Sequence, residues 1–172
     1  MITEQSNQFF HVDFDETEPY HYTECGLDNI FLLSGCEKIS LNGEISTSIH
    51  DIDDLHDCIL ETLARKKSIL TPKEIRFVRR EMHLTQTQLG NLVGSNGQCV
   101  GRWEKLSGKP TDIPTANDLL IKLMVLDHLT GAAPFEVLKE MTELDEGSSL
   151  SQSKLSAFND NKDFWKPERI AA

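Results

Sequence analysis

The residues best suited to chemical recognition lie in a short polar segment at 96–102, which reads N-G-Q-C-V-G-R. Gln98 carries an amide that can bind adenine N6 and N7 together, and Arg102, one helical turn later, can reach a guanine or a phosphate. A solvated glutamine and a solvated arginine are the alternatives. Gly97 and Gly101 each cost a helix roughly 0.5–1 kcal/mol relative to alanine, which favours close approach of the backbone to another surface. The base-reading candidates are Gln98, Arg102, Gly97 and Gly101.

A second set of polar residues could contact a phosphate backbone. Thr85 and Gln86 begin an expected helix, where side chains and backbone N–H groups can meet a phosphate. Capping alone is also a sufficient explanation for Thr85. Two lysines follow the recognition segment and are suited to pair with phosphates. The phosphate candidates are Thr85, Gln86, Asn96, Lys105 and Lys109.

Three short helices are expected to position these residues. Thr71-Pro72-Lys73-Glu74 has the pattern of a capping box with proline at the first helical position, and Thr85 with Gln88 repeats the box. Asn96 is expected to cap the third helix. The expected helices are 70–83, 84–94 and 97–105. The last two, joined by a tight turn, form a helix-turn-helix, the unit whose second helix fits a DNA major groove.

Small and aromatic residues in this segment have structural interpretations. Gly90 is expected where the next helix crosses closely, so that a side chain larger than a methyl group would clash. Gly94 is expected to end its helix in the left-handed region. Trp103 is expected to lie in the core beside Val100.

Charge is distributed unevenly along the chain. The net charge is −11, yet residues 65–109 hold ten Lys and Arg against three acidic residues, a net charge of +7. Residues 1–64 carry −13 and residues 110–172 carry −5. The basic region coincides with the helix-turn-helix, which favours contact with nucleic acid. The acidic flanks should lower non-specific affinity for DNA and raise the share of binding that base contacts supply.

Further elements are expected before this unit. Asn42-Gly43 between alternating apolar residues is a strong hairpin signal. A helix at 51–66, capped by Asp51 or Asp53, is expected to cover a small antiparallel sheet. The strands of that single sheet are expected near 28–33, 36–41 and 44–49.

Two more helices are expected after it. One runs over 115–129, is capped by Thr115 and ends at Gly131, and the other starts at Pro134 and continues to about residue 145. The expected organisation is a mobile arm at 1–19, a dimer or partner module at 20–67, a DNA-binding bundle at 68–146 and a loose tail at 147–172.

The four cysteines form no CxxC pair, and no signal peptide or membrane-spanning apolar run is present. Reduced thiols in a cytoplasmic protein, with no membrane partner, are therefore expected. A metal or nucleophile site could be imagined from His21, His50, Asp51, Asp53 and Cys25, but nothing in their spacing requires it. We expect no catalytic residue, no metal and no cofactor.

The segment 71–129 resembles the Cro/repressor (XRE) family of helix-turn-helix regulators, through Leu84-Thr85-Gln86, Leu89-Gly90, Gly94 and Val100-Gly101-Arg102-Trp103-Glu104. This resemblance implies a lambda-repressor-like five-helix bundle, and it implies that Arg79 pairs with Glu104 across two helices. The wider layout is similar to MqsA-type antitoxins, although the paired CxxC motifs that hold zinc in that group are absent.

The expected fold is therefore mainly α, a five-helix DNA-binding bundle with a small N-terminal unit of β-sheet plus helix. The expected function is sequence-specific binding of double-stranded DNA by a homodimeric transcriptional repressor, with the helix at 97–105 in the major groove. The two half-sites would lie about one turn, ~10 bp, apart. The alternative is an antitoxin whose acidic unit at 20–67 neutralises a basic toxin while the bundle represses its own operon.

Overall fold

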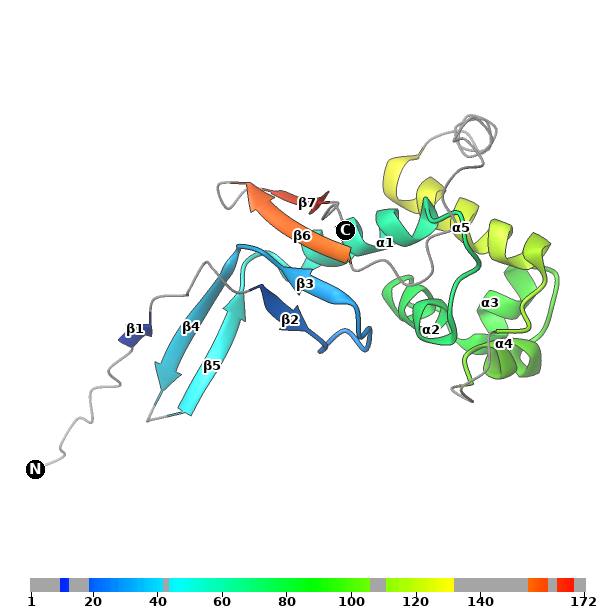
Figure 1. The fold of residues 1–172 in the computed structure, drawn as a ribbon. Helices are drawn as coiled ribbons and strands as arrows, with labels where there is room; N and C mark the ends of the chain where they lie inside the picture. The colour runs from blue at the N-terminus through cyan, green and yellow to red at the C-terminus, as the bar shows by residue number, and fades with distance from the viewer. Residues whose placement is uncertain are drawn as a thin grey trace, which may run out of the picture.

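The computed structural model describes residues 10–12, 19–41, 44–105, 111–131, 155–160 and 164–168. Within these ranges more residues are helical than extended, so the chain is mainly α. The helices gather on one side of the molecule and the strands on the other (Figure 1). The helices are α1 (Ile52–Ala64), α2 (Pro72–Glu81), α3 (Gln86–Leu92), α4 (Gly97–Trp103) and α5 (Thr115–Thr130).

The predicted N-caps form at α1 to α4. Asp51, rather than Asp53, accepts a hydrogen bond from the backbone of α1 at 3.2 Å. Thr71 and Thr85 each make a complete capping box, and Asn96 caps α4. These local signals explain why the helix starts agree with the sequence pattern.

The predicted cap of α5 is wrong. Thr115 is the first helical residue, and Pro114 occupies the cap position without a side-chain hydrogen bond. The reason is that the Pro114 carbonyl, in extended conformation, accepts the first hydrogen bonds of the helix from the amides of Asn117 and Asp118. Gly131 ends α5 as expected. The helix predicted to start at Pro134 lies outside the described residues.

The strands form two sheets, where a single one was predicted. Strand β3 (Ile30–Leu32) does not join the hairpin, because Gly35, with a φ of 73°, turns the chain between them. The hairpin itself, β4 (Cys36–Leu41) with β5 (Glu44–Ile49), forms as predicted. The first sheet has the order β1-β4-β5, with β1 at Phe10–Val12. The second has the order β2-β3-β6-β7, with β2 at Tyr20–Tyr22, β6 at Leu155–Asp160 and β7 at Phe164–Glu168.

Both chain ends depart from the expected loose segments. Strand β1 pairs antiparallel with β4, inside the predicted mobile arm. Strands β6 and β7 lie inside the predicted loose tail, and β6 runs parallel to β3. Trp165 holds β7 in place, since its backbone N–H donates to Asp54 Oδ2 at 2.6 Å and its indole N–H donates to the His50 carbonyl at 2.9 Å. The two segments were predicted to be loose from their local composition, which carries no information about contacts with distant residues.

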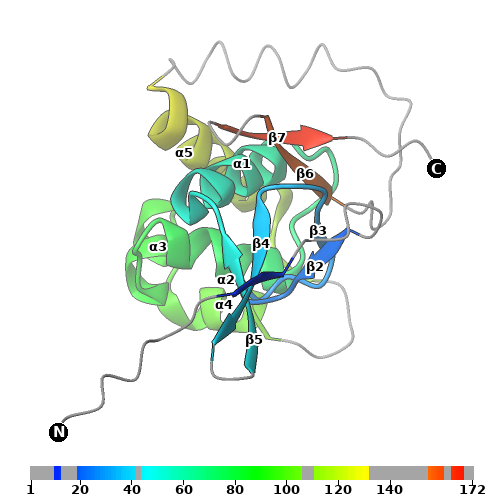
Figure 2. The same cartoon turned by 90° about the vertical axis from the view of Figure 1, so that its left-hand side faces the viewer.

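Helix α1 lies between the second sheet and the other helices. It contacts β7, α2 and α5 (Figures 1 and 2). Buried residues from the sheet, such as Leu32 and Ala157, belong to the same hydrophobic core as Ile59 of α1 and Leu126 of α5. The two units expected from sequence therefore share one core.

Buried polar ties fix the connector between α1 and α2. Asp118 Oδ1 accepts from the Leu70 amide at 2.8 Å, and Asp118 Oδ2 lies 2.7 Å from Lys122 Nζ. The same ammonium donates to the Ser68 carbonyl at 2.9 Å. Asp118 and Lys122 are both buried. The pair thus anchors the connector to α5 and satisfies backbone groups that would otherwise be orphaned.

A second polar tie joins β2, α1 and α2. The Tyr22 hydroxyl lies 2.8 Å from His56 Nε2, and His56 Nδ1 lies 2.9 Å from Glu81 Oε2. Burial raises the pKa of Tyr22 above its ordinary value. The phenol therefore stays neutral beside His56.

Replacing Trp165 with alanine should lower the free energy of unfolding by about 3–5 kcal/mol, because the side chain is 5% exposed and anchors β7. Urea denaturation followed by circular dichroism measures the change. The neighbouring Lys166→Ala variant, whose side chain is exposed, is the control and should change stability by less than about 0.5 kcal/mol. Equal stability of both variants would contradict the docking of β7.

Candidate nucleic-acid interface

A buried carboxylate organises the packing of α2, α3 and α4. Glu104, directly after α4, is 1% exposed. Its Oε2 accepts from Arg79 Nη2 of α2 at 3.0 Å and from Gln86 Nε2 of α3 at 2.9 Å. The expected pairing of Arg79 with Glu104 is thus present. Because one carboxylate bonds to two other helices, the relative positions of α2, α3 and α4 are fixed.

Two further hydrogen bonds reinforce this arrangement. Arg79 Nη1 donates to the Leu84 carbonyl at 2.8 Å, which holds the turn before α3. Arg76 Nη2 donates to the Glu104 carbonyl at 3.3 Å. Arg76 was not predicted to take part. Its position three residues before Arg79, on the same face of α2, is the signal that could have identified it.

The crossing of α3 and α4 is tighter than the sequence predicted. A Cβ on Gly90 would lie 2.4 Å from the Asn96 carbonyl carbon, so even a methyl group clashes, where a methyl was expected to fit. Gly94 has a φ of 68°, the left-handed conformation expected of it. Trp103 and Val100 are buried as expected.

Gly97 and Gly101, which were expected among the residues that read bases, lie against α3. A Cβ on Gly97 would lie 2.7 Å from Thr87 Oγ1, and one on Gly101 would lie 3.3 Å from Gln86 Oε1. The close approach that these glycines predicted is therefore made within the protein, to α3. They make room for helix packing and have no side chain with which to read a base.

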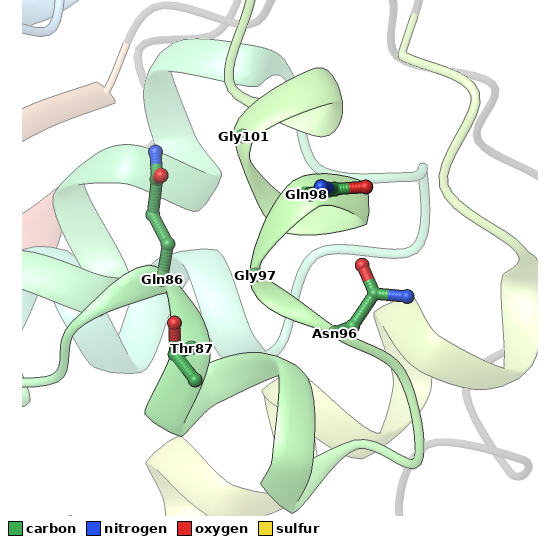
Figure 3. A pocket seen from close by; sticks show the side chains of 6 residues that line it. All are labelled: Gln86, Thr87, Asn96, Gly97, Gln98 and Gly101. Atoms are coloured by element: carbon green, nitrogen blue, oxygen red, sulfur yellow. The ribbon is translucent and has the colours of Figure 1, made fainter.

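A shallow hollow of about 490 Å³ opens between the starts of α3 and α4. Figure 3 shows Gln86 and Thr87 on the α3 side, with Asn96 and Gln98 at the start of α4. Thr87 was missed by sequence reasoning, and only its position next to Gln86 could have indicated it. The hollow is lined by Gln86, Thr87, Asn96, Gly97, Gln98 and Gly101.

Of the residues expected to read bases, Gln98 is the best placed. Its side chain is exposed, and within the described residues its amide has no hydrogen-bond partner. Arg102 is also exposed, but its Nε lies 2.8 Å from Asp112 Oδ2. An exposed pair of this kind is worth roughly 0–1 kcal/mol, so the guanidinium can leave Asp112 at low cost. The sequence between the two residues gave no local signal for this pairing.

The expected phosphate contacts divide into two groups. Thr85, Gln86 and Asn96 each use a side-chain oxygen or nitrogen inside the protein, in two caps and in the bond to Glu104. Lys105 is exposed directly after α4. Lys109 lies outside the described residues.

The basic region is less positive at its surface than its composition suggests. Arg79 and Arg76 face the buried Glu104, and Lys73 pairs with Asp28. Lys66 Nζ lies 2.8 Å from Glu74 Oε2, and Arg65 pairs with Glu61. Within the described residues, the exposed side chains of Arg80 and Lys105 have no ion-pair partner. Glu74 and Glu104 are already counted in the charge of +7. Only the pairs with acids outside residues 65–109, such as Lys73 with Asp28 and Arg65 with Glu61, make long-range attraction to a phosphate backbone weaker than that charge implies.

The remaining chemistry of the described residues is limited. The four cysteines are free thiols, and burial raises the pKa of Cys36 and of Cys58 to about 12, so both stay protonated at neutral pH. In the part of the chain that the structure describes, His, Cys, Asp and Glu side chains form no cluster of three or more that could hold a metal ion. None of the helices described is both long and apolar enough to span a bilayer.

Comparisons with known proteins identify no relative, since no family model, curated protein or solved structure matches the chain.

Replacing Gly90 with alanine should lower the free energy of unfolding by about 1–3 kcal/mol. The added methyl group clashes with the backbone of Asn96, and no side-chain rotation can relieve that clash. Gly101→Ala is the matched control on α4. It meets only the end of the Gln86 side chain and gains helix propensity, so its stability should stay within about 1 kcal/mol of the native chain. Urea denaturation compares the two, and a Gly90→Ala variant as stable as Gly101→Ala would contradict the close crossing.

Proposed function

We propose that this chain is a sequence-specific double-stranded DNA-binding protein that represses transcription as a homodimer. The observation that carries the proposal is the buried Glu104, which fixes α2, α3 and α4 while α4 presents an exposed Gln98. A lambda-repressor-like arrangement of the bundle is part of the same proposal. Fixed helices matter because base reading requires side chains that are already in position.

Helix α4 would enter the major groove. Its seven residues span about 10 Å, a length that the groove can admit. The Gln98 amide would bind adenine N6 and N7 as a pair. In the free protein Arg102 forms an exposed ion pair with Asp112. On binding DNA, the guanidinium of Arg102 would leave Asp112 and contact a guanine or a phosphate.

The phosphate backbone would be held by few cations. Lys105 and Arg80 are exposed and have no ion-pair partner among the described residues. With only these, Arg102 and any cation outside the described ranges, non-specific binding would be weak. Two half-sites in a homodimer, about 10 bp apart, would then multiply the discrimination of each α4.

An antitoxin is the second candidate, and the charge of residues 1–64 favours it. This region carries −13, and exposed acids such as Asp51, Asp53 and Asp57 lie at and beyond the start of α1. A basic partner protein would be attracted by this charge, for which a repressor acting alone has no special use. A small basic protein encoded beside this chain would favour the antitoxin, and its absence would favour the regulator.

Selection of bound DNA from a random duplex pool tests the proposal directly. The native chain should enrich a two-fold symmetric site, because a homodimer reads two half-sites. The Gln98→Ala variant should bind that site about 1–3 kcal/mol more weakly and lose its preference at one base position in each half-site. Asn91→Ala, exposed on α3 away from the hollow, should keep the native preference. An enriched sequence unchanged by Gln98→Ala would remove Gln98 from the reading set.

The Lys105→Gln variant should weaken binding to every duplex alike. Loss of one phosphate contact should reduce the slope of log affinity against log salt concentration by about 1. Titrations of the selected site and of a scrambled duplex at several salt concentrations measure both effects. Lys166→Gln, on β7, is the control. A loss confined to the selected site would contradict a phosphate role for Lys105.

A further inference from the structure

Strand β5 forms one edge of the first sheet. It pairs with β4 over its whole length, from Leu41 opposite Glu44 to Cys36 opposite Ile49. Strand β1 covers the other side of β4. On its outer side β5 has no neighbouring strand within the described residues, and the hairpin extends away from the helices (Figure 1).

The backbone groups that face this outer side can be identified. The His50 amide donates to the Gly35 carbonyl at 2.9 Å, so His50 faces β4. Residues of an antiparallel strand alternate between facing one neighbour and facing the other. The amides and carbonyls of Ile45, Thr47 and Ile49 therefore point to the open edge.

This edge lacks the features that usually keep strands apart. Exposed edges in natural proteins are protected by charged residues, especially lysine, or by proline and bulges. Strand β5 reads E-I-S-T-S-I, with one charged residue at its tip. Ile45 is 67% exposed. Thr47 and Ile49 are half-buried, and the Thr47 side chain hydrogen-bonds with Tyr20 of β2, but the backbone edge has no strand partner among the described residues. A nearly neutral, unpaired backbone edge within a strongly acidic region indicates that a strand adds to it.

We propose that β5 pairs antiparallel with β5 of a second copy, with Thr47 on the two-fold axis. Only outward-facing residues can exchange hydrogen bonds with each other, which restricts the register. Centring on Thr47 uses all of them, since Ile45 lies opposite Ile49 of the second copy. The two three-stranded sheets become one continuous sheet.

The side chains are self-complementary in this register. Ile45 and Ile49 form an apolar cross-strand pair on one face, next to the paired Thr47 residues. On the other face Ser46 lies opposite Ser48, and Glu44, the only acid on the strand, lies opposite His50. Such directly opposed pairs are the unit that stabilises sheets. A basic partner strand would find one acid on the edge, which is why the observations favour a second copy.

This interface specifies how the homodimer of the proposed function would form, and its biological role rests on that proposed function. The interface itself can be measured without DNA. Sedimentation velocity of the native chain should give twice the 19.4 kDa of one copy. The Thr47→Pro variant should sediment as a monomer, because it loses the central outward N–H while the bonds to β4 are kept. Thr47→Val retains the N–H and should stay dimeric.

Cross-linking tests the register independently. It remains a test of the interface in the case that the Thr47→Pro variant does not fold. The Cα atoms of the two Thr47 residues would lie about 5.5 Å apart, within disulfide range. A Thr47→Cys variant should therefore form a covalent dimer under mild oxidation. In Glu44→Cys the two introduced thiols would lie roughly 20 Å apart, at about 3.4 Å per residue, and should not cross-link. The native chain gives the background from its own cysteines.

A monomeric native chain, or a dimer that Thr47→Pro leaves unchanged, would overturn the proposal. Equal cross-linking of the Thr47→Cys and Glu44→Cys variants would overturn the register. These results are separable from the DNA experiments. A dimer of this kind that enriches no DNA site would refute the proposed function and leave the interface standing. A dimer that Thr47→Pro leaves unchanged, and that enriches a two-fold symmetric site, would do the reverse.

Discussion

The buried carboxylate of Glu104 is the constraint on which the rest of the helical part depends. A charge removed from water costs several kcal/mol unless hydrogen bonds replace its hydration. Here the replacements come from Arg79 on α2 and Gln86 on α3. Any arrangement that separates these helices leaves the charge without partners. The carboxylate therefore selects one packing of the helices over other compact alternatives, and the orientation of α4 follows from that selection.

The same logic connects the strands to the helices. Asp118 and Lys122 fasten the connector before α2 to α5, and Tyr22 reaches Glu81 through His56. The tie through His56 crosses between the two units expected from sequence, since Tyr22 and His56 lie in the unit at 20–67 and Glu81 lies in the bundle at 68–146. Polar groups buried at these junctions need particular partners, whereas the apolar core beneath them tolerates small displacements. Directly after β5, the His50 carbonyl accepts from the Trp165 indole, and the Trp165 backbone N–H donates to Asp54 of α1. An orientation imposed on β5 by a second copy would therefore be passed to α1.

Features that are determined by residues close together in the sequence could be predicted. Thr71 and Thr85 begin capping boxes whose partners lie three residues away, and Asn42-Gly43 sits between alternating strands, so the helix starts and the hairpin could be predicted. The helix-turn-helix residues Gln98 and Trp103 were placed for the same reason. Pairings between distant residues could not be predicted. Lys73 with Asp28, Trp165 with Asp54 and the separation of β3 from β4 depend on how elements pack, and so the surface charge and the second sheet were missed.

The parallel pairing of β3 with β6 has a consequence for how the chain is made. Ile30 lies opposite Leu155, so the second sheet joins segments from near the two ends of the sequence. During synthesis from the N-terminus, β3 emerges long before the strand that covers its edge. Helices α2 to α4 depend on contacts close in sequence and can form while the ribosome is still adding residues. Helices α2 to α4 would thus be assembled first. The edge of β3 that pairs with β6 would stay open, with a risk of mispairing, until residues 155–160 have been synthesised.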